Sequence, residues 1–335
     1  MSFINNFSTI IRKSNEEIIH IYEDGKLHLN FFDENNYMTN NKILDHLNQV
    51  DSSYCHFSLI KDDTVYGIFK DEALKMIEID ENKISTKTIL SYNNYKYDIL
   101  YPYINLINNE IHIFYYVFDN KSNTNCMLIH HHYKNDYWRE TRIDKVSLKV
   151  INNYEVVVLN EGPMVFYMST VNSVEEIFCS KFNYNTLRWS KPQQITSSGK
   201  NKIYLSVLED NNVFHITFCE NENSCYSVKY INGRLDAKEN FNLDISSFVS
   251  PPSACIYPSI LKEEDTISIL WVDFNKIYKA VSNDFGRTFG EITVDDFSAN
   301  ENFSMSKFLS NSSKDMSYKS SNVFSLYKDI SILGI

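Results

Sequence analysis

One short phrase, two apolar residues followed by a polar turn, occurs seven times along the chain at nearly even intervals. The first copy is Ile10-Ile11-Arg12-Lys13, and the next copies follow after 49, 47, 52, 49, 53 and 48 residues, ending at Phe308. A period near 50 residues falls in the range of β-propeller blades. The repeat therefore predicts a series of similar units, each of which buries its apolar faces against its neighbours.

Runs of residues with the pattern of β-strands follow the copies of this phrase. Residues 64–69, 111–116, 213–218 and 266–271 are rich in β-branched and aromatic residues, in alternating or continuous apolar runs. Turn-forming pairs such as Asn232-Gly233 separate such runs. The sequence has no long amphipathic helical pattern. Each repeat is therefore predicted to form four short strands, named A to D here.

The two ends of the chain are predicted to share the last blade. Six repeats account for residues 6 to 297, and the remainder predicts an A strand near Lys307, a B strand over residues 322–327 and a C strand over residues 330–333. Residues 1–7 could supply the D strand, which would close the ring and remove exposed sheet edges. We predict an all-β β-propeller of seven four-stranded blades, in a single domain spanning residues 1–335. Six blades with an extra C-terminal hairpin are the alternative.

A predicted tight turn near the C-terminus contains residues suited to stabilising a turn at almost every second position. An aspartate can accept backbone N–H bonds, a glycine can adopt positive φ, and an aromatic residue can fill an apolar slot. The residues are Ser282, Asp284, Gly286, Thr288 and Phe289. This segment resembles the Asp-box of sialidase-like (BNR-repeat) β-propellers, and residues 257–260 and 269–273 extend the resemblance. In that family the box is a structural turn away from the catalytic mouth, so the resemblance implies a structural role.

The residues for sialidase chemistry are absent from the expected places. The family binds the substrate carboxylate with three arginines, whose planar fork makes two parallel hydrogen bonds, and it uses a Tyr-Glu nucleophile pair and an Asp acid/base. The six arginines are Arg12, in a turn, and Arg139, Arg142, Arg188, Arg234 and Arg287, around C–D turns or on D strands. None begins an inner strand, and the family's Arg-Ile-Pro motif is missing.

The carboxylates of the sequence also give little support for a hydrolytic site. Other hydrolytic propellers need two or three inward carboxylates. Asp98 is the one candidate at the start of an inner strand, whereas Asp119 and Asp273 end B strands, where carboxylates are usually solvated. We therefore predict no catalytic residues.

A run of three histidines, His130 to His132, is the one candidate metal-binding feature of the sequence. His130 and His132 share a strand face, and His112 lies on the preceding strand of the same repeat, so three imidazoles could bind Zn²⁺. No carboxylate or cysteine completes the set at helix or loop spacing, and histidines on a solvated strand face are the commoner explanation. We expect no metal and no cofactor.

Tyrosine and phenylalanine are abundant, at 23 and 22 residues. The repeat places Tyr101, Tyr103, Tyr204 and Tyr257 where A strands begin, at the predicted channel mouth. Tyrosine is enriched at recognition surfaces because its ring is large and rigid and its hydroxyl stays hydrated. Ordinary packing between blades is the alternative for these residues, and it is the expectation for Trp138 and Trp189.

Composition limits the partners and the compartment. The net charge is −11 and the pI about 5.3, so the chain should repel nucleic acid and anionic membranes. No secretory signal or apolar span of membrane length is present, and we expect a cytoplasmic protein. The six cysteines are expected to be small buried hydrophobes, with a Cys219–Cys225 disulfide as the alternative. The wealth of Asn, Ile, Lys and Tyr is typical of low-GC bacteria.

Together these features predict a non-catalytic interaction module that binds a protein or glycan at one face of the disc. The alternative is a degenerate sialidase-like glycoside hydrolase. Two converging carboxylates, one with a raised pKa, would favour the hydrolase.

Overall fold

The computed structural model describes residues 2–44, 55–80 and 83–334. The chain divides into two compact units. One unit comprises Asn6–Val146 and Ser306–Met316, and the other comprises Met1–Asn5, Ser147–Met305 and Ser317–Ile335. The single-domain organisation stays a prediction.

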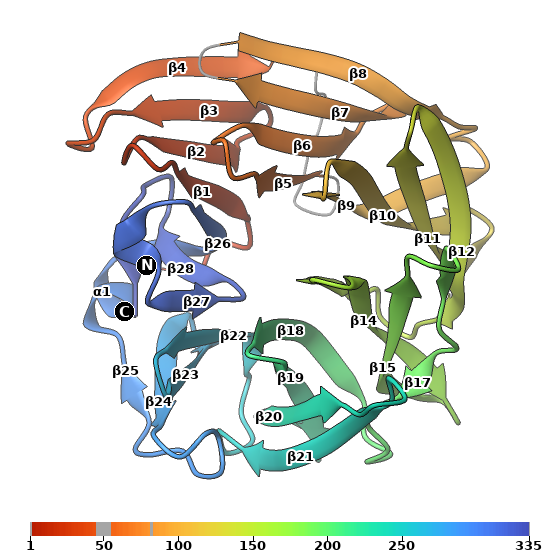
Figure 1. The fold of residues 1–335 in the computed structure, drawn as a ribbon. Coiled ribbons are helices and arrows are strands. Elements are labelled where there is room, and N and C mark those ends of the chain that lie inside the picture. The colour runs from red at the N-terminus through yellow and green to blue at the C-terminus, as the bar shows by residue number, and fades with distance from the viewer. Residues whose placement is uncertain (1, 45–54, 81–82, 335) are drawn as a thin grey trace. The chain divides into compact units, whose positions relative to one another are not determined.

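The unit that contains residues 6–146 is built from antiparallel four-stranded arrays (Figure 1). The first repeat forms β1 (Ser8–Arg12), β2 (Ile18–Glu23), β3 (Leu27–Phe32) and β4 (Met38–Leu44). The second forms β5 (Cys55–Leu59), β6 (Val65–Lys70), β7 (Ala73–Asp80) and β8 (Lys83–Ser91). The third forms β9 (Tyr97–Ile107), β10 (Glu110–Asp119), β11 (Ser122–Lys134) and β12 (Tyr137–Ser147). A 3₁₀ turn at Ser313–Asp315 belongs to the same unit.

The other unit repeats this arrangement. The fourth repeat forms β13 (Glu155–Leu159), β14 (Gly162–Val171), β15 (Val174–Asn183), β16 (Arg188–Trp189) and β17 (Gln193–Gln194). The fifth forms β18 (Lys202–Asp210), β19 (Val213–Glu222), β20 (Cys225–Leu235) and β21 (Phe241–Phe248). The sixth forms β22 (Ile256–Glu263), β23 (Thr266–Asp273), β24 (Lys276–Ser282) and β25 (Thr293–Val294), joined by β27 (Tyr318–Ser320). A short helix, α1 (Asp296–Asn300), begins at the cap Asp295, whose side chain accepts from the Ser298 N–H.

Every copy of the repeated phrase lies where the first strand of its repeat ends. Leu106 and Ile107, for example, end β9, and the next strand begins at Glu110. The turn residues Asn108 and Asn109 have φ of 53° and 63°, a pair of left-handed positions that suits a two-residue hairpin. Asparagine tolerates this conformation better than most residues, which explains the polar end of the phrase. The predicted repeat, the strands and the β-propeller fold are confirmed.

The C-terminal strands differ in part from the prediction. β26 (Phe303–Ser310), β28 (Val323–Leu326) and β29 (Ile332–Leu333) match the expected A, B and C strands of the seventh repeat. The expected D strand over residues 1–7 was wrong, because residues 2–7 contain only an isolated bridge from Phe3 to Phe303. β1 instead pairs in parallel with β26, Ser8 opposite Ser306, so an N-terminal and a C-terminal strand still meet. The strands of the described residues form six sheets in all.

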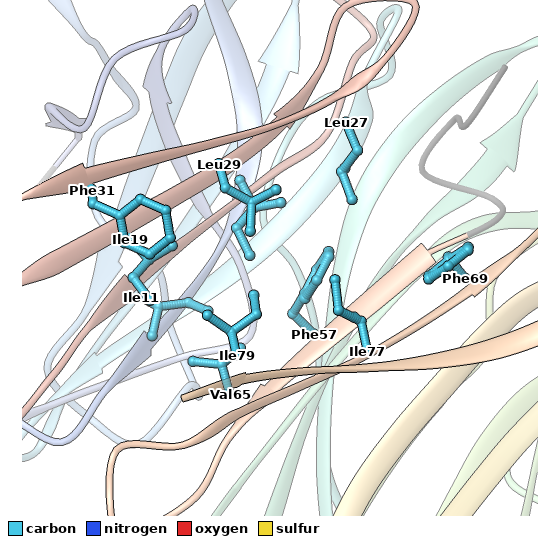
Figure 2. Close-up of a cluster of buried hydrophobic side chains, with 11 residues drawn as sticks. Ile11, Ile19, Leu27, Leu29, Phe31, Phe57, Val65, Phe69, Ile77 and Ile79 are labelled. Atoms are coloured by element: carbon cyan, nitrogen blue, oxygen red, sulfur yellow. The ribbon is translucent and has the colours of Figure 1, made fainter. Parts of the chain in front are cut away.

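Neighbouring sheets bury each other's apolar faces, as the repeat requires. Figure 2 shows such a cluster, in which side chains of β1–β3 face side chains of β5–β7. Ile11, Ile19 and Leu29 meet Phe57 and Ile79, and all are at most 2% exposed. Burying each such side chain contributes about 1.5–3 kcal/mol. Trp138 packs in the same way on a cluster shared by the second and third sheets, as expected for a wedge.

The six cysteines are all free thiols. Four of them are buried, as expected, whereas Cys225 is exposed. The pairing of β19 with β20 places Cys219 opposite Val228 and Cys225 opposite Glu222, so the alternative disulfide is not formed. Among the helices of the described residues, none has the length and apolarity to cross a membrane.

Candidate functional site

Three of the four predicted tyrosines share an unusual backbone conformation. Tyr101, Tyr204 and Tyr257 have φ of 53°, 58° and 50°. At each of them two residues of the first strand oppose one residue of the second, which is a β-bulge. A bulky residue in the left-handed region costs about 1–2 kcal/mol, and such strain clusters at ligand sites. The bulges give these three tyrosines a conformation that plain strand alternation would not.

Tyr204 and Tyr257 come together in the unit that contains residues 147–305. Their ring centroids lie 4.2 Å apart with the planes tilted by 44°, and both side chains are half-buried. The Tyr257 hydroxyl donates to Asn5 Oδ1 at 2.7 Å. Phe3 lies 5.2 Å from the Tyr257 ring and extends the aromatic surface. Burial raises the pKa of Tyr204, so its hydroxyl stays protonated at neutral pH.

Tyr101 and Tyr103 belong to the other unit and have their own contacts there. The Tyr101 ring meets Tyr116 edge-on at 6.4 Å. Tyr103 lies 4.1 Å from His56 and 5.9 Å from Phe114. Burial, with a contribution from the charge of Lys307, lowers the pKa of His56 to about 3. Ordinary packing therefore explains the position of the Tyr103 ring. A channel mouth formed by all four tyrosines stays a prediction.

A buried network of charges, which sequence reasoning missed, holds the strand that carries Tyr204. Lys202 is fully buried, with Nζ 2.8 Å from Glu176 Oε2 and 3.4 Å from Glu220 Oε2. Ser198 Oγ accepts from Lys202 at 2.9 Å and donates to Glu220 at 2.6 Å. Burial would raise the pKa of Glu220, but bonds from Ser198 and Lys229 outweigh it and lower the pKa. The ion pairs of Lys202 with Glu176 and Glu220 thus hold the start of β18 in place.

The carboxylates singled out from the sequence have different surroundings in the structure. Asp98 is held by Lys70 at 2.5 Å. Asp273 was expected to be solvated, and this was wrong: it is 8% exposed, with Oδ1 buried and lacking a hydrogen-bond partner in the described part of the chain. Wherever a carboxyl pKa is displaced in that part, it is lowered, because ion pairs and hydrogen bonds outweigh burial. That environment favours carboxylates over proton-donating acids.

The arginines lie where the repeat places them. Arg139 and Arg142 are exposed on β12, and Arg188 is exposed on β16. Arg12 makes two bonds to the Asp315 carboxylate, at 2.8 and 3.0 Å. Both bonds come from Nη1, so Arg12 is paired with a carboxylate of its own unit.

The turn at residues 282–289 is organised by Asp284. Asp284 Oδ1 accepts from the Thr288 N–H at 2.9 Å, and Oδ2 accepts from the Thr288 hydroxyl at 2.6 Å. Ser282 Oγ accepts from the Gly286 N–H at 2.8 Å, and Gly286 has φ of 84°. Phe289 packs edge-on against Tyr230 at 5.5 Å. All five residues named from the sequence therefore have structural contacts here.

The histidines do converge, with one ligand that sequence reasoning missed. No carboxylate completes the set at helix or loop spacing, but Glu110, at strand spacing from His112, lies against His112 and His132. In the sequence, Glu110 and His112 lie two positions apart on one strand, so their side chains are expected on the same face. Only the register of the paired strands shows that His132 lies opposite His112 and completes the group. These residues are the ones in the described part that could hold a metal ion.

Comparison with known proteins supports the fold alone. No family model and no curated protein matches the chain. The α-L-arabinofuranosidase Arb93A from Fusarium graminearum is similar in structure, with TM-score 0.54 and 9% identity, over 81% of this chain and 92% of that one. Polysaccharide lyase Uly1 has TM-score 0.54 and 8% identity, over 86% and 81%. The WD40 domain of SCAP from fission yeast has TM-score 0.50 and 11% identity, over 96% and 75%. The chain thus has the β-propeller fold that enzymes and interaction domains share.

Proposed function

We propose that this protein is a non-catalytic β-propeller of the sialidase-like superfamily that binds a glycan through the Tyr204–Tyr257 pair. The observation that carries the proposal is that two strained, half-buried tyrosines from different repeats meet ring to ring. The C–H face of a sugar packs well on such rings, while their hydroxyls can bond its hydroxyl groups. The strain favours a ligand-binding role over plain packing, because packing alone does not require left-handed tyrosines.

Two further points support a glycan ligand and no catalysis. The carboxyl groups with displaced pKa values favour the ionised form, so none of them has the raised pKa of a general acid. Two of the similar propellers, an arabinofuranosidase and a polysaccharide lyase, act on carbohydrate. Membership of the sialidase-like superfamily rests on the turn at residues 282–289. The acidic net charge supports the absence of nucleic-acid and membrane partners.

The test is a glycan array followed by calorimetry on the glycan that binds best. Tyr204→Ala and Tyr257→Ala should each weaken binding at least about tenfold, the scale of a 1.4 kcal/mol contact. Tyr95→Ala is the control, because Tyr95 is 94% exposed and far more accessible than either member of the pair. Binding of no glycan by the native chain, or equal binding by the Tyr257→Ala variant, would contradict the proposal.

A degenerate glycoside hydrolase is the second candidate, and Asp273 favours it. This carboxylate is buried at the end of β23, next to Val272, whose strand partner Ile256 precedes Tyr257. A panel of aryl glycosides tests it directly. Turnover by the native chain that Asp273→Asn abolishes would replace the binding proposal with this one.

A further inference from the structure

Three side chains on two neighbouring strands of the third repeat point to one place. His112 on β10 lies directly opposite His132 on β11 in the strand pairing. Glu110 precedes His112 by two residues, so its side chain projects from the same face of β10. Directly opposed residues have Cβ atoms about 4.5–5.5 Å apart, close enough for both side chains to reach one ion.

The ligand atoms of these side chains already converge. One donor atom from each of Glu110, His112 and His132 lies within 4.8 Å of the others. His132 Nε2 is 2.5 Å from Glu110 Oε2, and the two imidazoles stack with centroids 4.4 Å apart. Both histidines are buried, and the Glu110 side chain is 13% exposed. The site is thus enclosed on the histidine side and reachable from solvent at the carboxylate.

We propose that Glu110, His112 and His132 bind one divalent transition-metal ion of the Zn²⁺ type. Two imidazole nitrogens and one carboxylate oxygen form a ligand set for zinc, whereas Mg²⁺ and Ca²⁺ prefer oxygen ligands only. Zinc bonds of about 2.0–2.1 Å place neighbouring ligands about 3.3 Å apart, so modest side-chain rotations close the set. Three protein ligands leave the fourth tetrahedral position for water or a substrate atom.

The surroundings orient the ligands for this purpose. Glu110 Oε1 is held by Lys134 at 2.6 Å, which turns Oε2 toward the histidines. His112 Nδ1 lies 3.0 Å from His130 Nε2, so His112 can donate its Nδ1–H there and keep Nε2 for the metal. A metal-binding histidine usually donates its other ring N–H to a second partner, which fixes the orientation of the ring. His130 therefore acts as a positioning residue.

The protonation states agree with metal binding. Burial, with charge contributions from His132 and Lys134, lowers the pKa of His112 to about 3, so this ring is neutral at neutral pH. Burial would raise the pKa of Glu110, but hydrogen bonds from Lys134 and His132 outweigh it and keep the carboxylate ionised.

The competing explanation is a network in which Lys134 and His132 bond to the Glu110 carboxylate without an ion. Calorimetry of the full chain, freed of metal by a chelator, separates the two explanations. We expect one Zn²⁺ per chain and no heat with Mg²⁺. Bound Co²⁺ should give the intense visible absorption of a four-coordinate site.

Substitutions of the proposed ligands test whether the ion binds to these residues. Glu110→Gln and His132→Gln should each weaken Zn²⁺ binding at least about tenfold. His131→Gln is the matched control, because His131 lies on the same strand, contacts Glu140 at 2.7 Å and Tyr115 at 2.9 Å, and should bind Zn²⁺ as the native chain does. If His132→Gln fails to fold, the proposal is still tested by Zn²⁺ binding to the near-isosteric Glu110→Gln variant and by the number of Zn²⁺ ions bound per native chain. Absence of Zn²⁺ and Co²⁺ binding by the native chain, or unchanged binding by Glu110→Gln, would overturn the proposal.

Discussion

Gly286 faces the ring of Tyr230 so closely that a Cβ on Gly286 would lie 2.2 Å from a ring carbon. Tyr230 in turn accepts from Asn232 Nδ2 at 3.0 Å and lies 2.6 Å from His215 Nδ1 through its hydroxyl. Ser247 Oγ donates to the Gly286 carbonyl at 3.0 Å. The turn at residues 282–289 is therefore docked on the preceding repeat, and its glycine is required by space as well as by φ.

Gly286→Ala should destabilise the protein strongly. A left-handed alanine costs about 1–2 kcal/mol, and forcing a methyl into the Tyr230 ring adds about 1–3 kcal/mol. Urea denaturation measures the loss. Gly25→Ala is the control, because Gly25 also has positive φ, of 67°, but has nothing within 4 Å of an added Cβ. Equal losses in the two variants would show that the Tyr230 contact does not matter.

Asp284 should make stability depend on pH in the acid range. Hydrogen bonds from the Thr288 hydroxyl and N–H and from Ser282 lower its pKa from 3.8 to about 2. A carboxyl whose pKa is lowered by folding stabilises above its unfolded pKa, and this contribution is lost as pH falls from about 4 through 2. The melting temperatures of native chain and Asp284→Asn should therefore converge over that interval. A constant difference would contradict this reasoning, and Asp265→Asn, in an exposed turn, should follow the native chain throughout.

Removing Lys202 should be costly because of the charges it leaves behind. Lys202→Met would strand the buried carboxylates of Glu176 and Glu220, and breaking such a buried pair costs about 3–5 kcal/mol. Lys200→Met is the matched control, since Lys200 pairs with Glu222 at 2.5 Å but is 42% exposed, and exposed pairs contribute about 0–1 kcal/mol. The free energy of unfolding in urea gives both values. A loss below that of Lys200→Met would rule out a structural role for the network.

His215 should destabilise the fold as pH falls below neutrality. Burial, with the charge of Lys262, lowers its pKa from 6.5 to about 4. Between these values the unfolded chain binds a proton that the folded chain does not, so stability falls by up to about 1.4 kcal/mol per pH unit. His215→Gln can keep a bond to the Tyr230 hydroxyl without titrating, and its unfolding free energy should depend less on pH. An unchanged slope in His215→Gln would refute the assignment.

Local patterns predicted the fold well, because a repeat, its strands and its turns are each encoded within a few residues. Leu106-Ile107-Asn108-Asn109 marks a strand end and a two-residue turn by apolarity and by asparagine's tolerance of positive φ. The D strand predicted over residues 1–7 was wrong, because residues 2–7 contain only the isolated bridge from Phe3 to Phe303, which lies on the first strand of the seventh repeat and not on its C strand. Such pairing is decided by competition among distant strands, which no local pattern records.

By itself, the sequence determined the β-propeller, the positions of its strands and the internal bonds of the turn at Asp284. Their positions in the repeat also identified Tyr204 and Tyr257 as candidate binding residues. Only the tertiary structure decided that these two rings meet, that Lys202 is paired with Glu176 and Glu220, and that Glu110 joins His112 and His132. The physical reason is that strand alternation fixes the face from which a side chain projects, whereas bulges, register and sheet packing fix what it meets.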